Sequence, residues 1–427
     1  MLSILQDPNA LLVLAGSALL ALCSGLVGCF TLLRKRALVG DAVAHSILPG
    51  VCLAFMLSGT KSMLWLLPGA LIAGWIALLA MDVIVSKTKL KTDAATAIVL
   101  SVFFAFGIFL LTIIQKSGEG AQSGLDQFLF GKAAAMLPED VGIFSIVAIL
   151  IILTILAFFR PLVIVSFNPE FGKSIGMKVG AYEFLLSTMT VLAVSAGIQA
   201  VGVVLMAALL ITPAATARIW TDKFGLMMFI SSALAVFSAL AGTWMSYQSP
   251  GMPTGPWIIM FLSVIAVLSV FLAPKRGIAS RWLAARNNSR KIVRENVLKH
   301  IYQICEKSGD FKMMLKMDQI EGLHYMRVNK QMKILNALLK SNMLRRENQL
   351  WGLTDAGLTE SMRIVRLHRL WEMYLNQKLH LKPDHVHEGA EAMEHLITPE
   401  LEEMLKNDLG NPELDPHNSV IPYPHQP

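Results

Sequence analysis

The sequence predicts an all-α membrane domain of about nine transmembrane helices, followed by a cytoplasmic winged-helix domain and a helical metal-binding domain. Three observations carry this prediction. Long apolar runs follow one another up to about residue 274 of 427. Every second loop between these runs is basic, as in polytopic membrane proteins. A histidine and glutamate pattern with helical spacing stands near the end, in "HVHEGAEAMEHL", residues 385–396.

The composition divides the chain sharply. The whole chain is 54% hydrophobic with a mean hydropathy of +0.56, well above a soluble globular protein. Only 14 of the 37 Lys and Arg residues precede residue 275, and 23 follow in the much shorter remainder. The four cysteines form no CxxC pair, which argues against a disulfide framework or a zinc ribbon. We therefore expect a membrane part over 1–274, a basic connector over 275–292 and a soluble part beyond it.

A membrane-crossing helix needs roughly 20 apolar residues. Candidate spans lie at about 8–33, 39–59, 62–86, 93–114, 140–160, 181–197, 199–217, 225–246 and 255–273. The division within 181–217 depends on Gly197 and Gln199 alone. The first run lacks a basic segment before it and is followed by "RKR", so we expect a retained span rather than a cleaved signal peptide.

Basic residues orient the spans. They follow the first, third, fifth, seventh and ninth spans, as Arg34, Lys35, Arg36, Lys87, Lys89, Lys91, Lys173, Lys178, Arg218, Lys223, Lys275 and Arg276. The positive-inside rule then places the N-terminus outside and the C-terminal part in the cytoplasm.

One ionisable pair stands at the start of the second span, in "GDAVAHSILPG". Asp41 and His45 are four residues apart and share a helix face. Ionisable groups at membrane depth are costly and usually face a cavity or pathway, and an Asp with a His suits a first-row divalent metal. The alternative is a hydrogen-bonded pair that only locks helices together. The basic loop 168–180 is either an ordinary loop or a short amphipathic helix that docks a cytoplasmic partner.

Two segments carry a resemblance. "LRKRALVGDAVAHSILPGV" and "QAVGVVLMAALLITPAATARI" resemble the permease subunits of zinc/manganese/iron-type ABC importers, over nearly all of the first 274 residues. The resemblance implies that Asp41 and His45 belong to the metal pathway and that loop 168–180 contacts an ATPase. The chain has no GxxxxGK[ST] motif, so the ATPase is expected to be a separate subunit and the chain itself no enzyme.

The soluble part predicts a winged helix over 293–358. "RENVLKHIYQICEKSG" indicates a helix that ends at Gly309, and residues 317–344 indicate two helices with a turn near Gly322. "LRRENQLWGLTDAGLTES" indicates a hairpin and then a helix that starts at Thr354 or Asp355. The expected DNA-contacting residues are Arg327, Lys330, Lys333, Arg345 and Arg346. A solvated basic face used for protein contacts is the alternative.

The last region, 359–427, predicts a metal site. His368 and Glu372 share one helix face, and His387, Glu391, Glu394 and His395 share another within roughly a third of the circumference at about 100° per residue. Six nitrogen and oxygen ligands without a thiolate favour Mn²⁺, Fe²⁺ or Zn²⁺ over softer ions.

These residues also carry a second resemblance. "HRLWEMYL", "VHEGAEAMEH" and "NPELDPHNSVIP" resemble the metal-binding and dimerisation domain of the diphtheria-toxin-repressor family, over about 293–422. The resemblance gives the six residues ligand roles, and Glu391 in place of Cys resembles the manganese-responsive branch. The family's first helix supplies further ligands where this chain has Asn296 and Lys299, and a protonated Lys cannot ligate.

We therefore expect a permease in the bacterial inner membrane that imports a divalent transition metal, manganese first and then iron or zinc, with a fused metal-dependent regulator. The expected partners are a cytoplasmic ATPase, an extracytoplasmic metal-binding protein, a second permease copy, promoter DNA and membrane lipid. The soluble part either binds DNA, tethered or after proteolytic release, or acts as a metal-sensing valve on transport. A membrane receptor without transport is disfavoured by the permease motifs.

Overall fold

The computed structural model describes two compact units, Met1–Arg281 and Trp282–Pro427. Within them it describes residues 6–34, 36, 38–60, 62–116, 136–248, 252–274, 276–320, 328–382, 393, 395 and 397–423.

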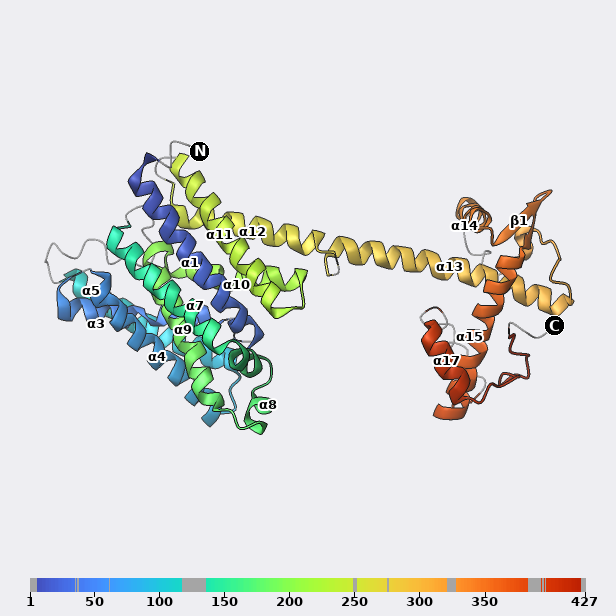
Figure 1. The fold of residues 1–427 in the computed structure, drawn as a ribbon, viewed down its shortest axis with the longest axis horizontal. Coiled ribbons are helices and arrows are strands. Elements are labelled where there is room, and N and C mark those ends of the chain that lie inside the picture. The colour runs from blue at the N-terminus through green and yellow to red at the C-terminus, as the bar shows by residue number, and fades with distance from the viewer. Residues whose placement is uncertain are drawn as a thin grey trace. The chain divides into compact units, whose positions relative to one another are not determined.

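The first unit is a helical bundle (Figure 1). Its helices are α1 (Pro8–Leu33), α2 (Val39–Ser46), α3 (Leu48–Ser58), α4 (Met63–Lys87), α5 (Thr92–Lys116), α7 (Pro138–Phe167), α8 (Pro169–Ser174), α9 (Val179–Val201), α10 (Val203–Trp220), α11 (Phe224–Gln248) and α12 (Thr254–Leu272). Local signals set several of their ends. Asp7, for example, caps α1 by accepting from the backbone N–H groups of Asn9 and Ala10, and Pro8 occupies the first turn.

Eight helical segments of the described residues are long and apolar enough to cross a membrane, with α2 and α3 together forming one of them. This confirms the all-helical, multi-span prediction. The predicted span that is not among these eight is the seventh, 199–217, which falls on α10, where the apolar segment Met206–Trp220 is shorter. The count of nine therefore stays a prediction.

The predicted break between the sixth and seventh spans is wrong by a few residues. Helix α9 continues to Val201, and the chain turns at Gly202, whose φ of 89° is one that residues with a side chain rarely adopt. Gly197 is helical instead, and a Cβ there would lie 2.2 Å from the Met206 sulfur. Its missing side chain serves packing, which sequence alone does not distinguish from a break.

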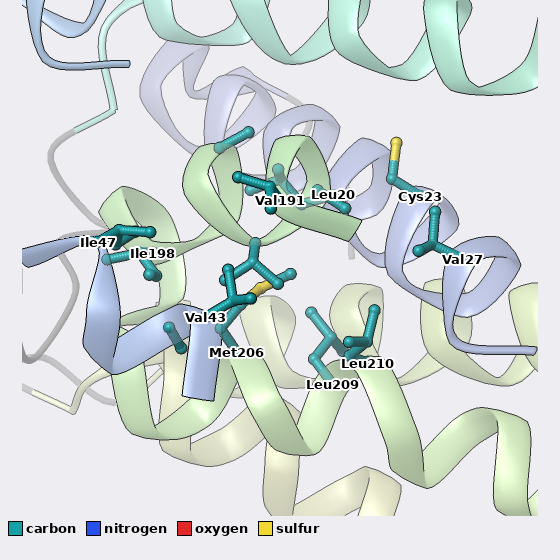
Figure 2. Packing of buried hydrophobic residues seen from close by; sticks show 14 of the residues in the cluster. Leu20, Cys23, Val27, Val43, Ile47, Val191, Ile198, Met206, Leu209 and Leu210 are labelled. Atoms are coloured by element: carbon teal, nitrogen blue, oxygen red, sulfur yellow. The ribbon is translucent and has the colours of Figure 1, made fainter. Parts of the chain in front are cut away.

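The core of the first unit is one cluster to which all its described helices except α8 contribute, and Figure 2 shows the part of it where α1, α2, α9 and α10 meet. Small residues let backbones approach, as in other membrane helices. A Cβ on Gly28 of α1 would lie 1.9 Å from the carbonyl oxygen of Leu210 in α10. Hydroxyls add interhelical hydrogen bonds, because Ser231 of α11 donates to the Gly25 carbonyl of α1 at 2.8 Å.

The closest approach of α3 and α4 predicts a stability effect. A Cβ on Gly50 would lie 2.1 Å from the carbonyl oxygen of Gly69, and the reciprocal distance is 2.4 Å. Gly50→Ala should separate the two helices and lower the free energy of unfolding by at least about 2 kcal/mol. Gly142→Ala is the matched control, because a Cβ there meets no atom within 4 Å. Unfolding of the two variants in detergent checks this, and equal stability would contradict it.

Charged residues pair at the ends of the bundle helices. Arg34 lies 3.7 Å from Glu183, and Arg36 lies 3.1 Å from Asp82. The loop after α1 is thereby tied to the start of α9 and the end of α4. The ends of these helices therefore lie together, as an alternation of basic and non-basic loops requires.

The second unit contains α13 (Ile278–Ser308), a 3₁₀ turn η4 (Met317–Gln319), α14 (Val328–Lys340), strands β1 (Leu344–Glu347) and β2 (Leu350–Leu353), α15 (Asp355–Leu379) and α17 (Pro399–Asp408). Helix α13 begins at Ile278, so residues 278–292 of the basic connector are helical, and it ends before Gly309 as predicted. The predicted turn near Gly322 lies outside the described residues.

The hairpin forms as predicted. β1 and β2 pair antiparallel, with Leu344 opposite Leu353, and Asn348 and Gln349 between them have positive φ, as a type I′ turn requires. Leu315 adds a bridge to Trp351. Thr354 caps α15 by accepting from the Gly357 N–H at 3.0 Å. Residues of α13, α14, both strands and α15 share one apolar core.

Candidate metal sites

Asp41 and His45 lie on one face of α2, with Asp41 Oδ1 3.6 Å from His45 Nε2. The Asp41 side chain is 41% exposed and that of His45 only 20%. The His45 ring packs edge-on against Phe104 of α5, with ring centroids 4.9 Å apart. An accessible carboxylate thus stands beside a half-buried imidazole.

His45 Nδ1 is buried and has no hydrogen-bond partner among the described residues. An unsatisfied buried polar atom costs on the order of 1–3 kcal/mol, so it needs an explanation. A pair that only locked helices together would be expected to satisfy this nitrogen. The nitrogen that faces Asp41 is Nε2, so a divalent cation shared by the two side chains would bind there, and the buried Nδ1 would not take part.

Packing holds α2 in this position. A Cβ on Gly40 would lie 2.5 Å from the Leu210 side chain, so α2 sits directly against α10. Figure 2 shows Val43 and Ile47 in the same buried cluster as Met206 of α10 and Ile198 of α9, and α2 contacts both of these helices. Both Val43 and Ile47 are almost fully buried. The apolar side of α2 therefore fixes the helix and leaves Asp41 and His45 on the remaining side.

The second predicted site begins on α15. His368 Nε2 lies 3.1 Å from Glu372 Oε1, and both side chains are nine-tenths or more buried. His387, Glu391 and Glu394 lie outside the described residues. Among the parts that the structure does describe, no group of three His, Cys, Asp or Glu side chains gathers.

His395 is described, and its partner was not predicted. Its Nδ1 lies 2.6 Å from Glu295 Oε2 on α13, a carboxylate that is buried and also 3.6 Å from Lys291. A carboxylate behind an imidazole is the usual arrangement for a metal-ligating histidine, because it orients the ring. The signal in the sequence was a single acidic residue in an otherwise basic stretch, next to Asn296.

His368 has the opposite kind of neighbour. The Lys299 ammonium of α13 is buried, and its Nζ lies 3.0 Å from His368 Nδ1. Lys299 is one of the two positions where the resembled family has a ligand. Burial raises the pKa of the Cys305 thiol on the same helix. The thiol therefore stays protonated and does not serve as a soft metal ligand.

Four of the five predicted DNA-contacting residues lie in the described part of the chain. Lys330 and Lys333 are exposed on α14, and Arg345 and Arg346 are exposed on β1. The Arg346 guanidinium lies 5.1 Å from the ring centroid of Trp351, and Arg345 donates to the Lys312 carbonyl at 3.2 Å. Arg327 lies outside the described residues. The helix and the hairpin thus each present two of the predicted DNA-contacting residues as exposed cations.

These features define a multi-pass helical membrane protein with a soluble unit whose buried imidazoles are paired with carboxylates. The chain belongs to the ABC 3 transport family, which matches residues 6–273. Residues 354–423 match the family described as iron dependent repressor, metal binding and dimerisation domain. Both resemblances seen in the sequence are confirmed, the second over residues 354–423. The chain is therefore a permease subunit, a non-catalytic membrane component that carries a repressor-type metal-binding and dimerisation domain.

Two curated relatives span most of their own length in this match. The chain is 40% identical over 378 residues to the manganese transport system membrane protein MntC of Bacillus subtilis, covering 88% of this chain and 86% of that protein. It is 41% identical over 266 residues to the zinc transport system membrane protein TroC of Treponema pallidum, covering 62% and 89%.

A solved structure supports the membrane fold. The structure titled PsaBC from Streptococcus pneumoniae in complex with Fab matches with 32% identity and a TM-score of 0.59, covering 66% of this chain and 97% of that one. As an ABC permease, the chain works with an ATPase and a substrate-binding protein.

Proposed function

We propose that the chain is the permease of an importer for a divalent transition metal, manganese first and then iron or zinc. The observation that carries this is the Asp41–His45 pair in the membrane unit, with Asp41 Oδ1 3.6 Å from His45 Nε2. The names of the manganese and zinc transport relatives support the same class of substrate. In this role Asp41 and His45 replace part of the hydration shell of the passing ion.

The ATPase docks on α8. This helix is capped by Asn168, which accepts from the Phe171 N–H at 3.0 Å, and its end is closed by Gly176 with a positive φ. Phe171 and Ile175 are both 52% exposed although the helix is short. A rigid helix with two exposed apolar side chains suits a socket on a cytoplasmic partner. Two permease copies complete the pathway, in the bacterial inner membrane, with the N-terminus outside and the C-terminal unit in the cytoplasm.

The second unit is a metal-dependent winged helix that binds promoter DNA. The support is the order of α13, α14, hairpin and α15, with Lys330 and Lys333 exposed on the helix before the hairpin. Exposed cations on such a helix suit phosphates and base edges. The start of α13 carries exposed Trp282 and Leu283 beside Arg281 and Arg286, which suits an anionic lipid surface. The alternative is a valve, in which bound metal pairs the C-terminal tails, residues 359–427, of two permease copies and this pairing closes the permease.

The C-terminal tail, residues 359–427, is expected to bind Mn²⁺ through His368, Glu372, His387, Glu391, Glu394 and His395. Glu391→Ala with Glu394→Ala should weaken this binding at least about tenfold, because ligands that are ionised carboxylates are lost. The test is calorimetry on the full chain, with Asp41→Ala and His45→Ala as a common background so that the membrane pair holds no ion.

Glu403→Ala is the matched control, since Glu403 is exposed on α17. Zn²⁺ should bind more tightly than Mn²⁺ at the same residues, as expected for nitrogen and oxygen ligands. Affinity for Mn²⁺ that is the same in the ligand variants and the control would reject this site.

A further inference from the structure

The two described histidines of the tail site have neighbours of opposite chemistry. His395 Nδ1 faces the carboxylate of Glu295 at 2.6 Å, and His368 Nδ1 faces the ammonium of Lys299 at 3.0 Å. Glu295 and Lys299 are one turn apart on α13 and both are buried. One helix therefore supplies an acceptor to one histidine and a donor to the other.

A carboxylate prepares an imidazole for a metal. It accepts the proton of Nδ1 and so leaves the lone pair of Nε2 available to an ion. An ammonium does the reverse, because it has three donors and no acceptor. When Lys299 donates to Nδ1 of a neutral His368, the ring proton stands on Nε2, the nitrogen that lies 3.1 Å from Glu372 Oε1. The nitrogen that a metal would need then carries a proton.

We infer that Lys299 is a built-in cation that takes the place of a metal ion at His368 and Glu372. The positive charge that an ion would bring to the buried His368 imidazole comes from the chain itself. This half of the site is organised without metal, and any metal response comes from the His395 half. The inference rests on the proposed function, in which the tail binds a divalent metal, and it narrows that function to one half of the predicted ligand set.

The test counts Mn²⁺ bound to the full chain by electron paramagnetic resonance, in the Asp41→Ala, His45→Ala background. Lys299→Glu supplies an acceptor to His368, and Lys299→Met removes the cation with little change in length. Lys307→Glu is the matched control, because Lys307 is exposed on the same helix. Both Lys299 variants should bind Mn²⁺ at least about tenfold more tightly than the control, or hold one more ion per chain.

Hydrogen exchange of α15 separates a change in metal binding from failure to fold. Without metal, α15 should exchange faster in Lys299→Met than in the wild type, and Mn²⁺ should restore its protection. In the wild type, protection around His368 should not respond to Mn²⁺.

Wild-type protein that loads as many ions, as tightly, as the Lys299 variants would overturn this inference alone. If neither the wild type nor any variant, Lys299→Glu included, binds Mn²⁺ at the tail, both this inference and the proposed metal response of the second unit are rejected.

Discussion

Replacing Asp41 by Ala should reduce metal uptake to the background of cells without the permease, a loss of at least about 100-fold. The carboxylate is the one anionic group of the α2 pair, and removing it leaves a partly desolvated cation without a compensating charge. His45→Ala should have a similar effect, because the imidazole supplies the second ligand. Uptake of radioactive Mn²⁺ by cells that lack their own manganese importers measures both.

Asp82→Ala is the matched control, an aspartate of the same unit that is half exposed at a helix end and paired with Arg36. It should retain most of the uptake. Assembly with the ATPase must be compared in parallel by co-purification. Normal uptake in both pair variants would reject the pathway role, and lost assembly would support the alternative of a pair that only locks helices together.

Charge reversal on α14 should have the second largest effect. Lys330→Glu with Lys333→Glu should weaken DNA binding by about 100-fold near physiological salt, because two favourable phosphate contacts become repulsive. The dependence of log affinity on log salt concentration should become less steep by about two. The measurement uses the full chain in nanodiscs and its own promoter region, with and without Mn²⁺, at low and near-physiological salt.

Lys340→Glu is the control for this pair, since Lys340 is exposed at the other end of the same helix. Binding that is absent in the wild type, or that ignores Mn²⁺, would reject the DNA-binding proposal. If transport also responds to removal of the tail, the valve is the better account.

Elements with strong local signals were predictable from sequence. The hairpin follows from turn residues that tolerate positive φ, Asn348 and Gln349, and the start of α15 follows from the Thr354 cap. The span boundary at Gly202 was missed because a glycine that permits a turn and a glycine that permits close helix packing look the same in a sequence. Gly202 is the first kind and Gly197 the second. Helix α13 begins earlier than predicted, at Ile278. Its first half is polar and lacks the apolar periodicity from which a helix is recognised in a sequence.

The site was only partly predictable, because its decisive contacts join residues far apart in the chain. The spacing of Asp41 and His45, or of His368 and Glu372, is a property of one helix and can be read directly. Glu295 meets His395, and Lys299 meets His368, only because α13 packs beside the metal-binding region. Sequence could show that Lys299 stands where a ligand was expected, but not that its ammonium meets a histidine.

The central claim is that this chain moves a divalent transition metal across the membrane with energy from a separate ATPase. The most direct test is accumulation of radioactive Mn²⁺ in proteoliposomes that contain the chain, its ATPase and its metal-binding protein. The account predicts accumulation that requires ATP, competes with Zn²⁺ and Fe²⁺ but not with Mg²⁺, and disappears with Asp41→Ala. Equal accumulation with and without ATP, or with and without the Asp41 carboxylate, would contradict it.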